Sequence, residues 1–126
     1  MAKFLLDTNV LIDFSKGKEP AKSNITQLLA TDEVGICAIN VAEFFTGLDQ
    51  AQRAQWSEFF ANLSYWEINL ETAQQAGVIR YDYLKKGKQL TTADALIGAT
   101  ALREKAVVIT RNVKDFPMVE ISVIES

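Results

Sequence analysis

The segment over residues 4–12 constrains the fold of this 126-residue chain more than any other. Three apolar residues lead to Asp7, then Thr8 and Asn9 follow, and a second apolar run begins. The pattern predicts a buried strand over 3–7 that ends at Asp7, and then a helix that Thr8 or Asn9 can cap. Ligands of open parallel sheets bind beyond the carboxyl ends of the strands, so Asp7 is a candidate site residue.

The rest of the chain alternates between strand-like and helix-like segments. Short apolar runs predict strands over 34–38, 65–68, 106–109 and 119–124, the last of them at an edge of the sheet. Apolar residues at helical spacing predict helices over 21–30, 52–62, 71–86 and 92–105, and one more that begins at Asn40. This alternation predicts an α/β fold, a three-layer α/β/α sandwich around a central and mainly parallel sheet. No linker or repeat interrupts it, so we expect one domain over 1–126.

The composition limits the kinds of catalytic and metal site that the chain can form. The chain has no histidine, which excludes Ser-His-Asp and Cys-His catalysis, a histidine-pair ribonuclease and the common zinc sites. Cys37 is the only cysteine, so no internal disulfide can form. We find no signal-peptide pattern and no apolar run near the roughly 20 residues that span a bilayer, so we expect a cytoplasmic protein. The net charge of −3 argues against broad electrostatic capture of nucleic acid but allows a local basic patch.

Two further acids, Glu43 and Asp94, stand near the starts of predicted helices. Each has an ordinary alternative role, because Glu43 follows Asn40 by three residues and Asp94 follows Thr91 by three, and both spacings fit a capping box. Asp7 likewise suits a helix cap. On a helical wheel, however, Glu43 lies opposite the apolar stripe of its helix, and Asp94 heads a helix that is apolar on nearly every side. Both acids can therefore face a shared site.

Asn112 and Asp115 follow the strand predicted over 106–109. They suit a turn, and they also suit a further polar contribution at the carboxyl end of that strand. Carboxylates about 4 Å apart would repel by about 4 kcal/mol per pair at an effective dielectric near 20, so such a cluster protonates, spreads or binds a cation. Oxygen ligands without His or Cys suit Mg²⁺ or Mn²⁺, and these ions support phosphodiester hydrolysis.

Four short motifs carry a resemblance to a known family. They are Leu-Asp-Thr-Asn-Val-Leu-Ile-Asp over 6–13, Asn-Val-Ala-Glu over 40–43, Thr-Ala-Asp-Ala-Leu-Ile-Gly-Ala over 92–99 and Thr-Arg-Asn-x-x-Asp-Phe over 110–116. In this order and spacing, the chain resembles the PIN-domain family, and most closely the VapC-type toxins of bacterial toxin–antitoxin pairs. The resemblance implies an RNA endonuclease that depends on Mg²⁺ or Mn²⁺. It implies Asp7 and Asp94 as the main metal ligands, with Glu43 holding a metal-bound water or a second ion.

The resemblance also implies supporting residues and partners. Thr8 and Thr110 would be supporting hydroxyls. Many family members carry an acid where this chain has Asn112, so the resemblance does not decide whether the site holds one metal ion or two. Asp115 either replaces that acid in part or stabilises the loop. A homodimer, a protein antitoxin that covers the site, and a tRNA or rRNA substrate are further family expectations. The stripe of Trp56, Phe59, Phe60 and Leu63 suits either a core or such an interface.

Cations near these acids are candidates for RNA contacts. Arg111 and Lys114 flank the expected site and are predicted to contact RNA phosphates. Residues 80–88 interleave bases with aromatics, which suits phosphate contact and base stacking, or else a helix C-terminus with lysines favoured by the dipole. A phosphatase of the haloacid-dehalogenase type would need an acid at position 9, which is Asn9. A PIN-like module that binds RNA or protein without cleavage stays open as an alternative.

Overall fold

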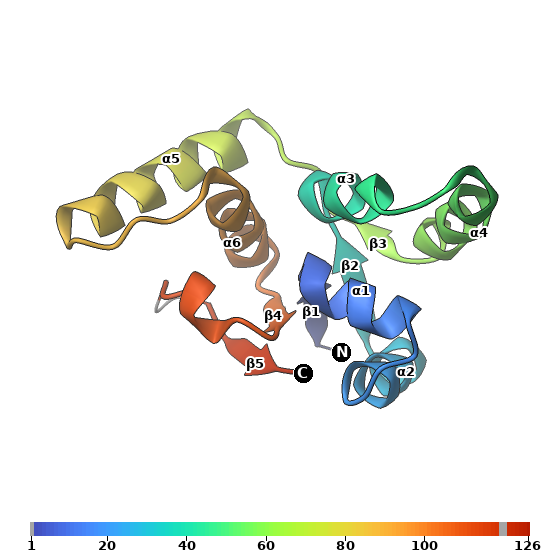
Figure 1. The fold of residues 1–126 in the computed structure, drawn as a ribbon. Coiled ribbons are helices and arrows are strands. Elements are labelled where there is room, and N and C mark those ends of the chain that lie inside the picture. Colours follow the sequence, from blue (N-terminus) through green and yellow to red (C-terminus); the bar gives the residue numbers. More distant parts are fainter. Residues whose placement is uncertain (1, 119–120) are drawn as a thin grey trace.

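Five parallel strands form the sheet in the computed structural model, which describes residues 2–118 and 121–126. Their order is β3-β2-β1-β4-β5, so the first strand of the chain is the central one (Figure 1). The strands are β1 (Lys3–Leu6), β2 (Glu33–Ile36), β3 (Ser64–Tyr65), β4 (Val107–Thr110) and β5 (Val123–Glu125). Every neighbouring pair is parallel. The predicted α/β fold with a parallel sheet is confirmed.

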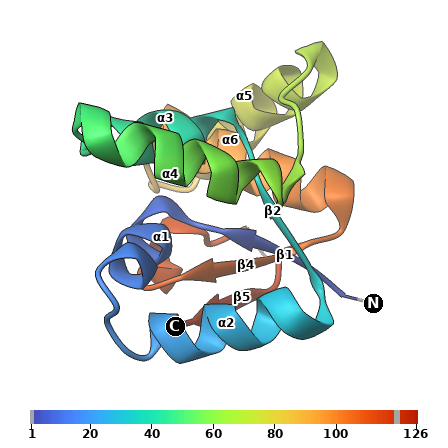
Figure 2. The same ribbon diagram turned by 90° about the vertical axis from the view of Figure 1, so that its right-hand side faces the viewer.

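Helices cover both faces of this sheet. They are α1 (Thr8–Ser15), α2 (Ala21–Thr31), α3 (Ala38–Thr46), α4 (Gln50–Ala61), α5 (Leu70–Lys85), α6 (Thr92–Glu104) and the short 3-10 helix η1 (Val113–Asp115). Figure 1 shows α5 and α6 together on one side and α1 and α2 on the other, and Figure 2 shows α2 beneath the strands. Within the described ranges, no helix has the length and apolar character needed to cross a membrane.

A hydrophobic core lies on each face of the sheet, because successive strand residues point to opposite faces. Leu5 and Val108 belong to the core that contains the apolar residues of α5 and α6. Leu6 and Ile109 belong to the core that contains those of α1 to α4. All four side chains are at most 4% exposed. The two cores together fix the strands whose carboxyl ends carry the candidate site.

The aromatic stripe of α4 belongs to the second core. Trp56 meets Phe44 of α3 with ring centroids 5.2 Å apart, and Phe60 meets the same ring at 5.4 Å. Phe59 stacks on Phe14 of α1 at 5.6 Å. Edge-on and offset contacts of this kind add to the stabilisation from buried area. Of the two interpretations of this stripe, core packing accounts for the contacts seen.

Gly35 of β2 lies directly against the indole ring of Trp66. A Cβ atom built at Gly35 would come within 2.6 Å of three atoms of that ring, closer than real Cβ contacts. Trp66 is 7% exposed and belongs to the core beneath α5 and α6. The absence of a side chain at position 35 therefore allows the ring to pack on the sheet.

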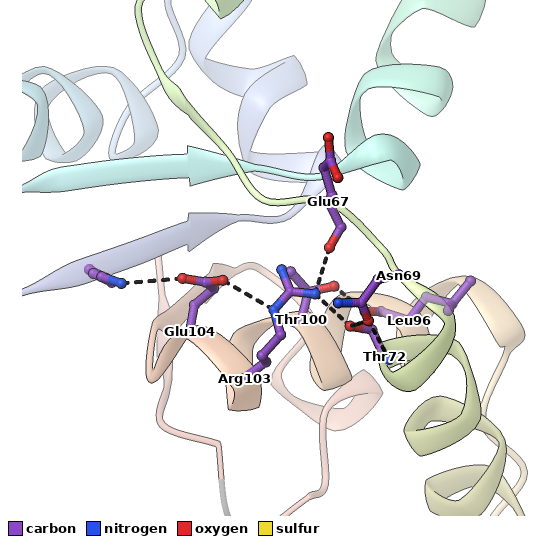
Figure 3. Close-up of polar contacts among 8 residues, drawn as sticks. Glu67, Asn69, Thr72, Leu96, Thr100, Arg103 and Glu104 are labelled. Atoms are coloured by element: carbon purple, nitrogen blue, oxygen red, sulfur yellow. Dashed lines mark hydrogen bonds and ion pairs between the residues drawn. The ribbon is translucent and has the colours of Figure 1, made fainter.

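A polar network at the C-terminal end of α6 holds that helix in place. The guanidinium of Arg103 donates to the backbone carbonyl of Glu67, to the hydroxyl of Thr72 and to the carboxylate of Glu104 (Figure 3). Glu104 in turn pairs with Lys3 of β1 at 3.2 Å. These contacts join α6 to the start of α5 and to the central strand. Asp94 lies at the other end of the same helix.

Several boundaries differ from the sequence predictions. The cap of α1 is Asp7 itself, not Thr8 or Asn9, and β1 ends at Leu6. The strand predicted over 65–68 is β3, which spans only Ser64–Tyr65. Of the strand predicted over 119–124, residues 119–120 lie outside the described ranges and 121–122 are not in a strand, so β5 begins at Val123, at the edge of the sheet as expected.

The start of α3 was also predicted wrongly. The helix begins at Ala38 and is capped by Cys37, whose backbone N–H donates to the side-chain oxygen of Asn40 at 3.0 Å. Asn40 is fully buried in the first turn, so it does not form the proposed capping box with Glu43. The acid of α3 is therefore free of a capping role.

Candidate active site

Asp7 lies at the carboxyl end of the central strand, and both oxygens of its carboxylate are held. Oδ1 accepts a 2.8 Å hydrogen bond from the backbone N–H of Thr8, which caps α1. Oδ2 accepts a 2.8 Å bond from the hydroxyl of Thr110, which ends the adjacent strand β4. The side chain is buried, and this burial is the main reason why the pKa of Asp7 lies above its usual value. Asp7 therefore caps a helix and also places a carboxylate at the strand end.

Glu43 reaches the same place from the middle of α3. Its Oε1 accepts a 2.6 Å hydrogen bond from the hydroxyl of Thr8. Thr8 thus contacts both acids, one through its backbone N–H and one through its side chain. The side chain of Glu43 is exposed, and its negative charge contributes to the raised pKa of Asp7 and of Asp94. The two threonines that were predicted as supporting hydroxyls are the direct partners of Asp7 and Glu43.

Asp94 lies in the first turn of α6. The helix is capped by Thr91, whose hydroxyl accepts a 3.0 Å hydrogen bond from the backbone N–H of Asp94. The pKa of Asp94 is raised to about 6. Partial burial is the largest cause of this rise, and the charges of Asp115 and Asp7 add to it. A hydrogen bond from Thr91 opposes this rise. A carboxyl group with this pKa takes up a proton as the pH falls through about 6, and a bound cation would favour its charged form.

The acid that completes the cluster is Asp115, at the end of η1. Its charge raises the pKa of both Asp7 and Asp94, so it faces the same site. Asn112 is exposed, and its backbone N–H donates to the hydroxyl of Thr110 at 3.0 Å. No hydrogen bond from the Asn112 side chain is found among the described residues. The structure therefore groups Asp115 with the other carboxylates, while Asn112 shapes the loop through its backbone.

Arg111 is held at the rim of the cluster by a residue that sequence reasoning did not select. Its Nε atom lies 3.1 Å from Oδ2 of Asp13, which is on α1. Asn9, one turn earlier on α1, accepts a 3.4 Å bond from the backbone N–H of Arg111 and donates to Thr110 at 3.4 Å. Asn9 and Asp13 are four residues apart and so share one helix face. That spacing was the only signal in the sequence, since their partners lie about a hundred residues later.

The second predicted cation, Lys114, lies on the same loop. Arg111 and Lys114 both line an open, polar hollow of about 460 Å³, together with Asp115. Both cations are exposed. The hollow adjoins the acid cluster through Asp115, so an anion bound in it would lie next to the carboxylates. This is where the structure places the two predicted phosphate contacts.

The residues at this edge fit a hard divalent cation by their donor chemistry. Asp7, Glu43, Asp94 and Asp115 offer only oxygen, and burial and the neighbouring negative charges disfavour the charged forms of Asp7 and Asp94. Within the described residues no three of these carboxylates are already close enough to hold one ion directly. Mg²⁺ does not require that, because it keeps several waters and is bound through one or two carboxylates. The site supplies such carboxylates from separate elements.

A comparison of the sequence with models of protein families identifies the family of this chain. The model of the PIN domain matches residues 4–120, which include all of these side chains. The chain belongs to the PIN-domain family. The resemblance inferred from the four sequence motifs is confirmed.

Curated PIN-domain proteins of similar length resemble this chain over most of its residues. Ribonuclease VapC19 of Mycobacterium tuberculosis is 25% identical over 115 residues, which cover 90% of this chain and 92% of that protein. The tRNA(fMet)-specific endonuclease VapC of Salmonella typhimurium is 28% identical over 121 residues, which cover 92% of this chain and 91% of that protein. The structure of a toxin–antitoxin complex from Klebsiella pneumoniae has 29% identity and a TM-score of 0.76, with coverage of 98% of this chain and 96% of that one.

Proposed function

We propose that this PIN domain is a metal-dependent endoribonuclease and the toxin of a toxin–antitoxin pair. The observation that carries the proposal is that four acids lie near one another: Thr8 hydrogen-bonds to both Asp7 and Glu43, and the charges of Asp7, Glu43 and Asp115 raise the pKa of Asp94. Each comes from a different element, and their charges are coupled. Relatives of similar length that are named ribonucleases support the RNA substrate.

The chain's residues have distinct roles in this proposal. Asp7 and Asp94 would be the main ligands of Mg²⁺ or Mn²⁺, and Glu43 would hold a metal-bound water or a second ion. When bound, the ion makes hydroxide accessible from water near neutral pH and neutralises charge that grows on the phosphodiester. Thr110 and Thr8 orient the carboxylates of Asp7 and Glu43 through the hydrogen bonds described above. Asp115 adds negative charge near the same carboxylates, which favours the binding of a cation there.

Arg111 and Lys114 bind substrate phosphate beside the acids. The charge of this small cluster would repel a phosphodiester, so nearby cations are needed to hold one there. Arg111 is oriented at two points, through its backbone by Asn9 and through its guanidinium by Asp13. A guanidinium already held in place loses little conformational freedom when it binds a phosphate. The hollow lined by Arg111 and Lys114 is open enough to admit one.

The proposed partners are a protein antitoxin and a second copy of the chain. The Klebsiella pneumoniae structure, a toxin–antitoxin complex with a closely similar fold, supports the antitoxin. A hollow of about 330 Å³ lies between α1, α3 and α4, and its lining includes Glu43, Phe44 and Trp56. A partner segment seated there would combine apolar contact with direct access to Glu43. Such a segment would block the site.

The test is RNA cleavage by the purified, antitoxin-free chain with Mg²⁺, Mn²⁺ or EDTA. End-labelled initiator tRNA is the first substrate because the Salmonella typhimurium relative is named for it, and total rRNA is the second. The Asp94→Asn variant, purified in parallel, is the control because it removes one charge without a change of shape. We expect cleavage with metal, none with EDTA, and a loss of at least about a hundredfold in the variant.

The other outcomes separate the alternatives. Cleavage that persists in both EDTA and the variant indicates a contaminating ribonuclease and contradicts the proposal. A folded chain that binds Mg²⁺ and RNA but cuts neither substrate supports the binding-module alternative. Circular dichroism of both proteins ensures that a lost fold is not taken for a lost function.

A further inference from the structure

The C-terminal end of α5 and the turn after it carry a basic surface that the proposed catalytic site does not use. Residues 80–88 contain four cations and one acid, a formal charge of +3 in a chain whose total is −3. Lys85, Lys86 and Lys88 are exposed. Positive charge this concentrated attracts polyanions locally even when the whole molecule is acidic. We call residues 80–88 the basic turn.

Two tyrosines lie among these lysines in fixed relation to them. The Nζ atom of Lys85 is 5.2 Å from the ring centroid of Tyr81, and that of Lys86 is 4.9 Å from the ring of Tyr83. Tyr81 is 61% exposed, although a fold gains stability by burying such a ring. A charged amine next to an exposed ring offers a phosphate contact and a stacking surface within one nucleotide. Single-stranded RNA presents both groups, whereas paired bases are stacked on each other.

Two hydrogen bonds link the basic turn to the segments next to Asp94 and Asp115. The hydroxyl of Tyr83 donates to the carbonyl of Pro117 at 2.6 Å, two residues after Asp115. The Nε atom of Arg80 donates to the carbonyl of Leu90 at 2.9 Å, four residues before Asp94. Extended chain spans at most about 3.5 Å per residue, so Lys88, six residues before Asp94, lies within roughly 21 Å of it along the chain. RNA in the site can therefore reach the turn within a few nucleotides.

A hollow of about 240 Å³ adjoins Tyr81. Its lining includes Tyr81 and Leu84 of α5 and Leu90 of the loop that leads to α6, and it is mostly apolar. Arg80 also lines it, with the guanidinium held by the bond to Leu90. An aromatic face, aliphatic walls and a fixed guanidinium plane are the surroundings that unpaired bases take in protein complexes. The hollow is therefore shaped for a base whose phosphates meet the lysines.

A purely structural role explains only part of this surface. Lysines favour the C-terminus of a helix because of its dipole, and this accounts for Lys85 and Lys86. It does not account for Lys88, which lies beyond the helix end, or for the exposure of Tyr81. Gly87 has φ of +81°, which reverses the chain and brings Lys88 back so that its N–H bonds to the carbonyl of Tyr83. The turn thus brings the backbone of a third cationic residue back against the last turn of α5.

We propose that the basic turn binds a single-stranded segment of the RNA substrate outside the catalytic site, with lysines on phosphates and an unpaired base on Tyr81. The inference rests on the proposed function, because it takes the substrate to be RNA. It adds a second contact region that would place the cut at a set distance from an unpaired base. The region belongs to the end of α5 and the loop before α6, whereas the acids lie after β1, on α3, in the first turn of α6 and on η1.

The test measures RNA binding without cleavage. The probe is a fluorescein-labelled, unstructured RNA of about 15 nucleotides, long enough to cross both regions. All proteins carry Asp94→Asn and are kept in EDTA, so that no probe is cut. Fluorescence anisotropy is recorded between roughly 50 and 200 mM salt, because the slope of affinity against salt counts phosphate contacts. The main variant replaces Lys85, Lys86 and Lys88 by glutamine.

The matched control replaces Lys18, Lys22 and Lys105 by glutamine, which removes the same charge from other exposed positions. We expect the basic-turn variant to bind at least about 10-fold more weakly, with a salt slope smaller by about 2, and the control to change little. Tyr81→Ala should weaken binding by about 5-fold or more, and Tyr81→Phe should keep it, because stacking needs the ring and not the hydroxyl.

The results that overturn the inference are distinct from failure of the nuclease. Equal affinities for the basic-turn variant, the lysine control and their parent exclude the turn, even where the wild-type chain cuts RNA. No binding of the parent at roughly 50 mM salt also excludes it. Loss of affinity in Tyr81→Ala together with a smaller mass in sedimentation assigns the ring to self-association instead. Loss of binding in the variants of a chain that never cuts RNA retains the turn and removes the nuclease.

Discussion

Replacing Asp94 by asparagine is expected to make the metal-free protein more stable at neutral and alkaline pH. The carboxylate is partly buried and faces other negative charges, and its pKa is about 6 instead of 3.8. Above this pKa the charged form is less favourable in the folded chain than in the unfolded chain. Asparagine has almost the same shape and no charge, so it removes the penalty while the cap of α6 by Thr91 is kept.

The size of the gain in stability follows from this shift in the pKa of Asp94. A change from 3.8 to about 6 corresponds to roughly 3 kcal/mol, at about 1.4 kcal/mol for each pH unit. Solvent screens a half-buried side chain, which leaves about 1.5 kcal/mol. Losing a negative charge in the first turn of α6 costs about 0.5 kcal/mol through the helix dipole. The net gain is about 1 kcal/mol in the free energy of unfolding, or roughly 4 °C in Tm.

The gain must also depend on pH in one direction. Below the unfolded-state pKa near 4, the carboxyl group is protonated in both states, and the two proteins differ little. As the pH rises through about 4 to 6, the wild-type chain loses stability that the variant does not lose. At about pH 4 we therefore expect only about a fifth of the gain seen at about pH 8. The isoelectric point near 4.9 lies between these values, so solubility favours measurement at both ends of the range.

The assay is urea unfolding followed by circular dichroism in EDTA, with Glu58→Gln as the control. Glu58 is an exposed acid of α4, and its replacement removes the same charge and should change stability by less than about 0.5 kcal/mol. Adding Mg²⁺ should reverse the order, because the ion stabilises the wild-type chain by mass action and binds the variant poorly. An Asp94→Asn protein no more stable than wild type at pH near 8 without metal would refute the electrostatic reasoning.

Substitutions at Asp7, Arg111 and Gly35 test other parts of the structure. Both Asp7→Asn and Asp7→Ala should abolish cleavage, but the alanine variant should be less stable by about 1 kcal/mol in urea, because only asparagine keeps an oxygen to cap α1. Arg111→Ala should weaken RNA binding about 10-fold by anisotropy, and calorimetry should show unchanged Mg²⁺ affinity; equal RNA affinity would remove its phosphate role. Gly35→Ala should cost about 2–3 kcal/mol in thermal unfolding because its Cβ meets Trp66, whereas Gly77→Ala, with open space in α5, should gain about 0.5 kcal/mol.

The sequence predicted the fold well because its signals were periodic. Short apolar runs between helical patterns gave the strands and helices to within a few residues, and the rule that ligands bind at the carboxyl ends of parallel strands selected Asp7. Thr110 was selected only through the family resemblance. The 2.8 Å hydrogen bond between Asp7 and Thr110 joins residues 103 positions apart. Glu43 and Asp94 were placed at the same edge by the same argument. The catalytic role of these residues stays a prediction.

Contacts that depend on a specific partner could not be predicted in this way. The ion pair of Asp13 with Arg111 has no periodic signature, because each residue alone suits an exposed position. Asn40 was taken for a helix cap because polar residues commonly start helices, yet the chain starts α3 two residues earlier and buries Asn40 against Cys37. Helix ends are set by competition among neighbouring residues, and tertiary packing decides that competition.

The position of the first strand at the centre of the sheet has a consequence for synthesis in the cell. β1 is made well before one of its two neighbours, β4. A growing chain therefore leaves one edge of β1 unpaired, and Asp7 lacks the hydroxyl of Thr110 until that strand emerges. Asp94 and Asp115 arrive late as well. The candidate site is therefore not assembled until the chain has been made through Asp115.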